Sequence, residues 1–129
     1  MNIPKEPEGY GIRYVPVQEE PVEENTVYEV VDNMPEFPGG MIALMDFIEN
    51  NIQYPVETQK KGMQGRVVVQ FIVDEDGCII EPNIVRSVEP FLDEEALRII
   101  KILPKWKPGT LYGKPVKVKF TVPVAFKLK

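Results

Sequence analysis

The chain has 129 residues, a net charge of −5 and a hydrophobic content of 43%, which fits one domain with at most a tail. No apolar run approaches the ~18–20 residues that a membrane-spanning helix needs. There is no histidine and a single cysteine, Cys78, so an internal disulfide and the commonest general base and metal ligand are excluded. We therefore expect a protein that is not an enzyme and that uses no metal and no cofactor.

Charge is unevenly distributed along the chain. Residues 1–36 contain nine acidic and two basic residues, whereas residues 96–129 contain nine basic residues and no acidic one. Such segregation is typical of a solvated acidic tail beside a basic surface, and it also fits a basic C-terminal half that faces an anionic or polar partner. Neither a nucleic acid nor a small-molecule substrate is predicted.

Residues 1–33 are expected to form a flexible linker rich in Pro and Glu, because frequent proline and like charges leave too little apolar surface for a core. Residues 34–129 are expected to form the domain. Two short β-prone patches interrupt the linker, Ile12–Val17 and Val27–Val31. The second patch either adds a short strand at 27–31 to the domain or stays in the linker.

A helix is predicted directly after Met34–Gly40, a turn-forming segment with two prolines and two adjacent glycines. Apolar residues recur there at helical spacing and are expected to face the core: Met41, Leu44, Met45, Ile48 and Ile52. The helix ends before Tyr54-Pro55, since the residue before a proline avoids the α region. Val56–Lys61 is expected to add one further helical turn.

A β-hairpin follows. Val67–Val73 is dominated by β-branched residues and forms the first strand, Asp74–Gly77 the turn, and Cys78–Arg86 the return strand. Strict alternation is lost at Glu81-Pro82, which predicts a bulge or an edge there.

Leu92–Leu103 is the second predicted helix, with acidic residues in its first turn and a lysine in its last, the polarity that the helix dipole favours. Pro104 ends it. The next turn holds the single tryptophan, Trp106, which we expect to be a core side chain whose indole N–H is hydrogen bonded.

The final segment, Lys114–Lys129, alternates apolar and polar residues and is predicted to be a long half-buried strand. Pro123 lies within it, and because proline cannot donate to a ladder, the strand is expected at an edge. A right-handed helical crossover then gives the strand order 2-1-3. The predicted fold is α+β, with two helices packed on one face of a three-stranded antiparallel sheet.

Pro123 also predicts which main-chain groups of this strand face outward. If its missing N–H would point away from the sheet, residues of the same parity also point outward. A docking peptide would then use the main chains of Lys117, Lys119 and Thr121.

Motifs across residues 34–129 resemble the C-terminal domain of TonB, in the form common in Bacteroidetes-type bacteria. The resemblance rests on the order and spacing of Met34–Gly40, Gln53-Tyr54-Pro55, Gly62-x-x-Gly65-x-Val67-x-Val69-x-Phe71, Asp76-Gly77, Leu92-Asp93-x-Glu95-Ala96-Leu97, Pro104-x-Trp106-x-Pro108-Gly109, Gly113–Val116 and the final strand. It implies a TonB/TolA-like periplasmic domain whose parent protein is anchored in the inner membrane by an N-terminal helix that is not present in this chain.

The resemblance also implies a function as an energy transducer. In the family, the domain binds the N-terminal TonB-box peptide of outer-membrane TonB-dependent transporters by strand addition. It passes on force from an inner-membrane ExbB/ExbD-like motor complex, which the absent N-terminal part would contact, for active uptake. The implied peptide site consists of the Gln53-Tyr54-Pro55 region and the Val116–Phe126 strand. Its named residues are Gln53, Tyr54, Pro55, Val116, Lys117, Val118, Lys119, Phe120, Thr121 and Val122.

Two other hypotheses stay open. The domain could be a structural or dimerising envelope module, similar to TolA, whose sheet edge pairs with another protein, a second copy in a homodimer or its own N-terminal patch. An enzyme that uses the carboxylates of Asp74, Asp76 and Glu95 is disfavoured, because histidine is absent and the first two residues lie at a hairpin tip.

Overall fold

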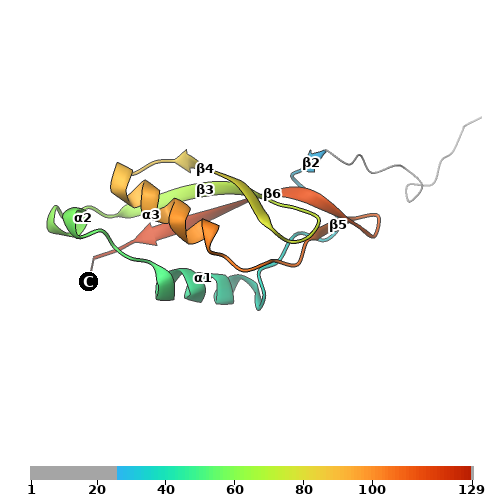
Figure 1. Cartoon of the computed structure of the whole chain (residues 1–129), viewed down its shortest axis with the longest axis horizontal. Helices are drawn as coiled ribbons and strands as arrows, with labels where there is room; N and C mark the ends of the chain where they lie inside the picture. Colours follow the sequence, from blue (N-terminus) through green and yellow to red (C-terminus); the bar gives the residue numbers. More distant parts are fainter. Residues whose placement is uncertain (1–25, 129) are drawn as a thin grey trace, which may run out of the picture.

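Residues 26–128 are described by the computed structural model, and they form three helices and a five-stranded sheet (Figure 1). The expected linker residues 1–25, with the patch Ile12–Val17, lie outside the described residues. The predicted division into a linker of residues 1–33 and a domain of residues 34–129 stays a prediction. The α+β class predicted from the sequence is confirmed.

The sheet is built around β3 (Gly65–Val73), which pairs antiparallel with β4 (Ile79–Arg86) on one side and with β6 (Lys114–Phe126) on the other. β2 (Val27–Tyr28) runs parallel to β6. β5 (Gly109–Leu111) forms a hairpin with the beginning of β6. The order is β2-β6-β3-β4. The expected count of three strands, all antiparallel, is wrong. β2 lies in the patch 27–31 whose pairing the sequence left open, and β5, with three residues, is too short to show a period of two.

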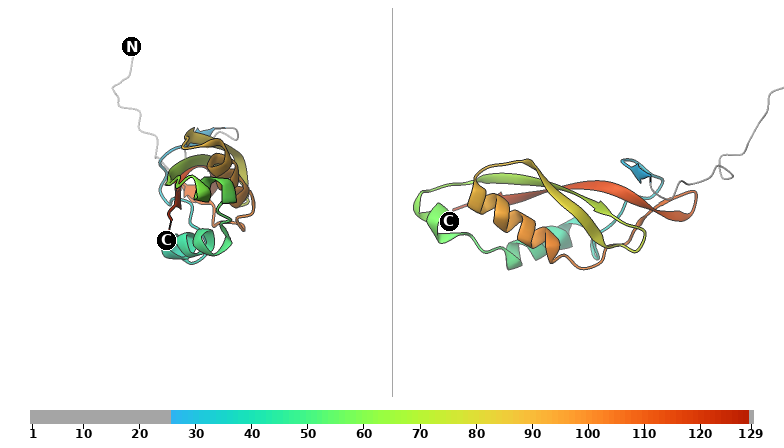
Figure 2. Two further views of the ribbon diagram at one scale, coloured as in Figure 1. Left: turned by 90° about the vertical axis from the view of Figure 1, so that its left-hand side faces the viewer. Right: turned by 45° about the horizontal axis from the view of Figure 1, so that its top comes forward.

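The two longer helices, α1 (Gly40–Asn51) and α3 (Pro90–Lys101), lie on the same face of the sheet (Figures 1 and 2). α2 (Val56–Lys60) is the further helical turn expected after Pro55, and it brings the number of helices to three. The expectation of two helices is therefore wrong in its count. α3 begins two residues earlier than predicted because the side chain of Glu89 accepts a hydrogen bond from the N–H of Leu92 at 3.1 Å.

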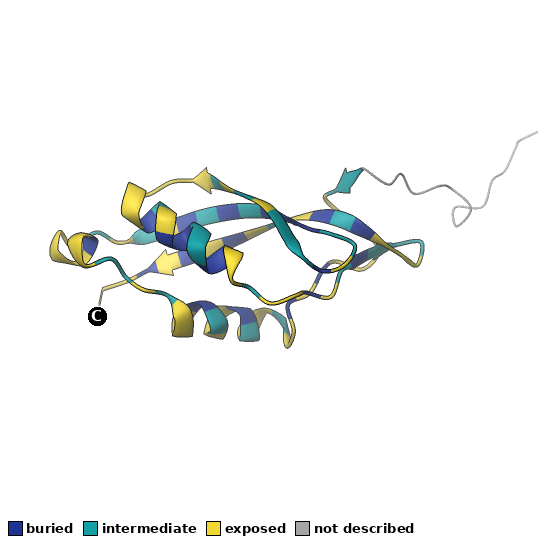
Figure 3. Cartoon of the chain, viewed as in Figure 1, coloured by how far each residue is buried: buried dark blue, intermediate teal, exposed yellow. Residues whose placement is uncertain are grey.

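The core lies between these helices and the sheet, and Figure 3 shows its buried positions alternating along β3 and β6. Val67, Val69 and Val73 of β3 are fully buried opposite Val124, Val122 and Val118 of β6. Between them, Phe71 is buried and its partner Phe120 is half-buried. The alternation read from the sequence thus assigns the faces of both strands correctly.

The helix α1 buries a narrower stripe than expected. Leu44 and Ile48 are buried, but Met41 is 53% exposed and Met45 is 37% exposed. The assignment of Met41 and Met45 to the core is therefore wrong. A helix that packs against one edge of a sheet is buried on one side only, so residues on the flank of its apolar stripe stay accessible.

Trp106 is a core side chain, as predicted, in contact with three aromatic rings. Its centroid lies 5.8 Å from that of Phe37, 5.5 Å from that of Phe71 and 5.0 Å from that of Phe120, all close to edge-to-face. The expected hydrogen bond of its indole N–H is wrong, because Nε1 is buried without an acceptor among the described residues. Aromatic rings surround the indole and supply no oxygen.

The β3–β4 hairpin has a bulge at Glu81-Pro82, where the sequence predicts a bulge or an edge. The ladder shifts register between Gln70 and Ile72, opposite Glu81-Pro82, and Glu81 has a positive φ of 50°. At the hairpin tip, the N–H of Trp106 donates to the carbonyl of Gly77 at 2.8 Å. The turn therefore docks against the segment that follows α3.

Candidate functional site

The outer edge of β6 becomes unpaired along its C-terminal half. β5 pairs with β6 up to Val116, and β2 pairs with Lys117 and Val118. Across residues 119–126, β6 pairs with β3 alone in the part of the chain that the structure describes. Such an edge presents N–H and C=O groups to which an extended chain can hydrogen bond.

Pro123 determines which main-chain groups of β6 face outward. It pairs with Val68 inside a β3–β6 register that is continuous along the whole of β3. Because proline has no N–H for β3, this pair must be one of the non-hydrogen-bonded pairs, which alternate with hydrogen-bonded pairs. The main chains of Lys119, Thr121 and Ala125 therefore face outward, as the sequence-based parity argument expects.

β2 restricts how much of this edge is free. Val27 pairs with Lys117 and Tyr28 pairs with Val118, and parallel pairing uses the main-chain groups on both sides of the paired residue. Of the three main chains expected to hold a peptide, that of Thr121 is the one clear of β2. The open section of the edge therefore runs from Thr121 to Ala125.

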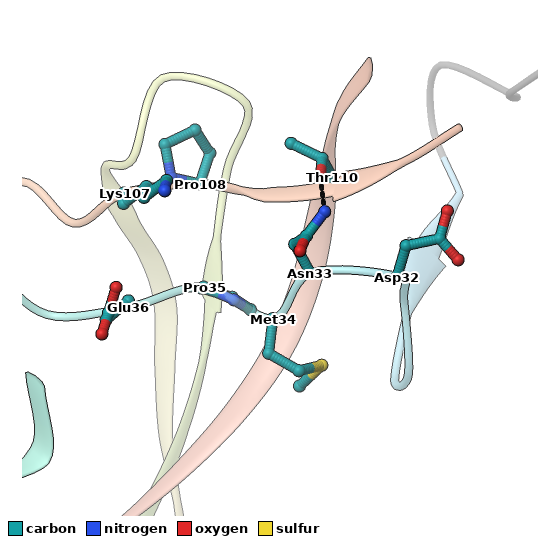
Figure 4. A pocket seen from close by; sticks show the side chains of 8 residues that line it. All are labelled: Asp32, Asn33, Met34, Pro35, Glu36, Lys107, Pro108 and Thr110. Carbon is teal, nitrogen blue, oxygen red and sulfur yellow. Dashed lines mark hydrogen bonds between the residues drawn. The ribbon is translucent and has the colours of Figure 1, made fainter. Parts of the chain in front are cut away.

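A strap of residues 32–36 fixes the end of β2 against β5 (Figure 4). The main chains of Asn33 and Thr110 exchange hydrogen bonds of 3.2 and 2.9 Å, and the Asn33 side chain donates to the Thr110 hydroxyl at 2.9 Å. Glu36 and Lys107 exchange main-chain bonds of 3.0 and 2.8 Å. A pocket of about 620 Å³ lies along this strap, and its polar groups are largely used in holding the strap itself.

The Gln53-Tyr54-Pro55 motif lies at the far end of β6 from Val116. The ring of Tyr54 packs edge-on against Phe126, with 5.5 Å between the centroids, and its hydroxyl donates to the carbonyl of Met63. Val116 is ten residues away from Phe126, which is roughly 33 Å along a strand. The predicted site residues therefore do not form one cluster: the motif adjoins the C-terminal end of the strand.

A buried carboxylate holds this motif in place. Glu95 on α3 is 8% exposed, and its Oε2 accepts a hydrogen bond of 2.6 Å from the N–H of Gln53. Arg98 donates to both oxygens of Glu95, at 2.7 and 2.8 Å, and to the carbonyl of Asn51 at 2.9 Å. The hydrogen bond to Glu95 raises the pKa of Arg98 above its usual value. α3 is thereby tied to the loop between α1 and α2.

The carboxylates named for the enzyme hypothesis have structural partners. Oδ1 of Asp74 accepts the N–H groups of Asp76 and Cys78, both at 2.9 Å, and so closes the hairpin turn. Glu95 anchors the motif on α3, away from the hairpin tip. Among residues 26–128, no group of three or more acidic or cysteine side chains is placed to hold a metal ion.

A groove runs beside the open edge, between α1 and the C-terminal end of β6. Its volume is about 1400 Å³. The apolar residues that line it are Met45, Ile48, Ile52, Tyr54, Pro123, Ala125, Phe126 and Leu128. The expected peptide site contains Tyr54 and the strand as far as Phe126, but not Leu128 or the residues on α1, because the latter were assigned to the core. The helical position of Met45, on the flank of the apolar stripe, is the signal that could have identified it.

Three helices and a mixed sheet that ends in a partly open edge define an α+β domain of the TonB C-terminal type. The family model for the C-terminal part of the Gram-negative bacterial TonB protein matches residues 50–128, and the chain therefore belongs to this family. The protein TonB of Helicobacter pylori strain ATCC 700392 / 26695 is 29% identical over 91 residues, and that of strain J99 is also 29% identical over 91 residues.

Solved structures agree with this assignment. The chain matches two NMR solution structures of the Helicobacter pylori TonB C-terminal domain, each with a TM-score of 0.54 and with 25% and 26% identity. The matches cover 68% of this chain and 79% and 92% of the two domains. The matched region spans 30% and 31% of the length of the two curated relatives. Within residues 26–128, none of the helices is both long and apolar enough to cross a membrane.

Proposed function

We propose that this chain is the periplasmic C-terminal domain of a TonB-type energy transducer, a non-enzymatic protein anchored in the inner membrane. It binds the N-terminal TonB-box peptide of an outer-membrane transporter as an added strand. Through that strand it transmits force that an ExbB/ExbD-like motor complex generates, for active uptake. Membership of the TonB C-terminal family and the similarity to TonB of Helicobacter pylori support this proposal.

The unpaired outer edge of β6 from Thr121 to Ala125 carries the proposal. A strand added there continues the ladder of the long strands and gains main-chain hydrogen bonds without any change in the fold. The opposite edge of the sheet, β4, is less suitable. A register shift, a proline and the positive φ of Glu81 interrupt it, and such irregularities discourage pairing.

A homodimer formed through the same edge is the second candidate function. If two β6 strands paired antiparallel with Pro123 at the centre, each copy would lack one N–H donor there, because proline has none. It would also place Lys119 of one copy opposite Lys127 of the other, and like charges directly opposite each other are destabilising. The charge of this edge therefore favours a peptide over a second copy.

The test is an NMR titration of the full chain with N-terminal peptides of outer-membrane transporters from the same organism. We expect saturable shifts and slowed amide exchange at Thr121 and Ala125, because their N–H groups enter a ladder. Amide shifts confined to β4, or the absence of binding by every peptide, would contradict the proposal. Concentration-dependent broadening without peptide would instead indicate the dimer.

A further inference from the structure

We propose that the groove between α1 and β6 is a specificity site that takes every second side chain of the docked strand. It selects extended segments in which apolar side chains alternate with acidic ones. This inference rests on the proposed strand addition at the β6 edge and adds the chemistry of the sequence that is selected.

The parity of β6 directs half of the docked side chains into the groove. In paired strands, directly opposite residues point to the same face of the sheet. Val122 and Val124 point to the face covered by the helices, where both are buried. A strand added about 4.8 Å beyond β6 therefore directs the residues opposite these two valines toward α1. The part of the groove that α1 lines, with Met45, Ile48 and Ile52, lies on that side.

The groove is lined by apolar side chains that the fold leaves accessible. Met45 is 37% exposed and Leu128 is 36% exposed, whereas Ile48, at 5%, forms part of the floor. Tyr54 closes the groove near the end of β6. Covering these side chains with apolar residues of a peptide removes both surfaces from water, which favours binding in proportion to the area buried.

The remaining side chains of the docked strand lie on the other face, where the neighbouring groups are cationic. Lys119 points to the face away from the helices, and Arg66 and Lys127 border the groove. None of these three forms an ion pair within residues 26–128. The groove has a single acidic lining residue, Glu49 on α1. Acidic side chains at alternate positions of the docked strand would therefore lie in surroundings of net positive charge on this face.

A double-mutant cycle on the full chain tests the inference with two synthetic heptapeptides. One alternates Val and Asp, and the other alternates Ser and Asp. Binding is measured by calorimetry at low and moderate salt for wild type, Met45→Glu and Ile42→Glu. Ile42 is the matched control, because it lies on the same helix, is 79% exposed and does not line the groove.

We expect the Val/Asp peptide to bind wild type and Ile42→Glu at least about tenfold more tightly than the Ser/Asp peptide, or about 1.4 kcal/mol. In Met45→Glu this preference should fall to less than about threefold, with an unchanged thermal unfolding curve. A preference that survives in Met45→Glu would overturn the inference while leaving strand addition intact. If both peptides bind equally with shifts at Thr121 and Ala125, the groove is not a specificity site. If neither binds, strand addition itself fails.

A second pair of peptides tests the charge. A peptide alternating Val and Lys should bind wild type at least about tenfold more weakly than the Val/Asp peptide at low salt, and the difference should shrink as salt is raised. Lys119→Gln should reduce the same difference. Equal affinity of the two peptides would contradict the acidic half of the pattern.

Discussion

Tyr54 packs edge-on against Phe126, and its hydroxyl donates to the carbonyl of Met63. This contact joins the loop between α1 and α2 to the last residue of β6, 72 positions away along the chain. Because Phe126 is 1% exposed, its ring is fixed from both the core and the loop. The C-terminal end of β6 is therefore held both by the core and by the loop between α1 and α2.

Tyr54→Phe and Tyr54→Ala separate the two parts of this contact. Tyr54→Phe keeps the ring and loses the hydrogen bond to Met63, so we expect a loss of about 1 kcal/mol in unfolding free energy. Tyr54→Ala also removes the ring from Phe126 and should cost about 3 kcal/mol, since large-to-small changes at packed aromatics do. Urea denaturation followed by circular dichroism measures both. Equal losses would show that the ring contact contributes nothing.

Glu95→Gln should destabilise the domain because it weakens the hydrogen bond that the Gln53 N–H donates to residue 95. The Gln53 N–H loses a charged acceptor at 2.6 Å, which costs about 1–3 kcal/mol. Asp93→Asn is the control on the same helix, because its carboxylate accepts from the exposed Ser87 and Val88 and not from the motif. The amide shift of Gln53 should move in the first variant and not in the second.

The ion pair between Glu95 and Arg98 should keep its contribution to stability at mildly alkaline pH. The hydrogen bond to Glu95 raises the pKa of Arg98 in the fold, so the stabilisation is complete below the pKa of the unfolded chain and disappears only as the pH rises through the folded value. Thermal unfolding of wild type and Arg98→Lys should therefore differ by a constant amount between pH 7 and pH 9. A gap that widens with pH over that range would contradict this assignment.

Gly77→Ala and Gly113→Ala compare a close approach with a turn in open space. Both glycines have left-handed φ, at 85° and 77°. A Cβ on Gly77 would lie 1.9 Å from the carbonyl oxygen of Trp106, whereas a Cβ on Gly113 meets nothing within 4 Å. Gly113→Ala should cost about 1–2 kcal/mol of backbone strain, and Gly77→Ala clearly more. Denaturation followed by Trp106 fluorescence reports on both, and similar midpoints for the two variants would be inconsistent with the hairpin contact.

The sequence predicts the long elements and their faces well because each carries a period that packing reinforces. Val67, Val69 and Phe71 recur at every second position of β3, and their partners on β6 recur at the same spacing. β2 could not be predicted as firmly, since its position depends on a strap whose partner Thr110 lies 77 positions away from Asn33 in the sequence. The groove was missed for a related reason. Met45 fits a core pattern along α1, and only the position of the helix beside the sheet edge leaves it accessible.

Removing β2 should lengthen the edge available to a peptide. A chain that begins at Asp32 loses the pairing of Val27 and Tyr28 with Lys117 and Val118, and it keeps the strap that binds Thr110. We expect a peptide long enough to reach Lys117 to bind this chain more tightly than the full chain, because it no longer competes with β2. A peptide that spans only Thr121–Ala125 should bind both equally in calorimetry. Weaker binding of the long peptide after truncation would mean that β2 assists docking.

Thr121→Pro and Val122→Pro test the assigned edge most directly. The main chain of Thr121 faces outward and its side chain is exposed, so a proline there should leave the β3–β6 ladder in place. It removes one outward N–H and places a ring against any docked strand. We therefore expect circular dichroism close to wild type and at least tenfold weaker peptide binding, or about 1.4 kcal/mol. The main chain of Val122 faces β3, and its side chain is fully buried. Val122→Pro should break the ladder at a cost of about 3 kcal/mol or more. A folded Thr121→Pro protein that binds peptide as tightly as wild type would exclude this edge as the docking site.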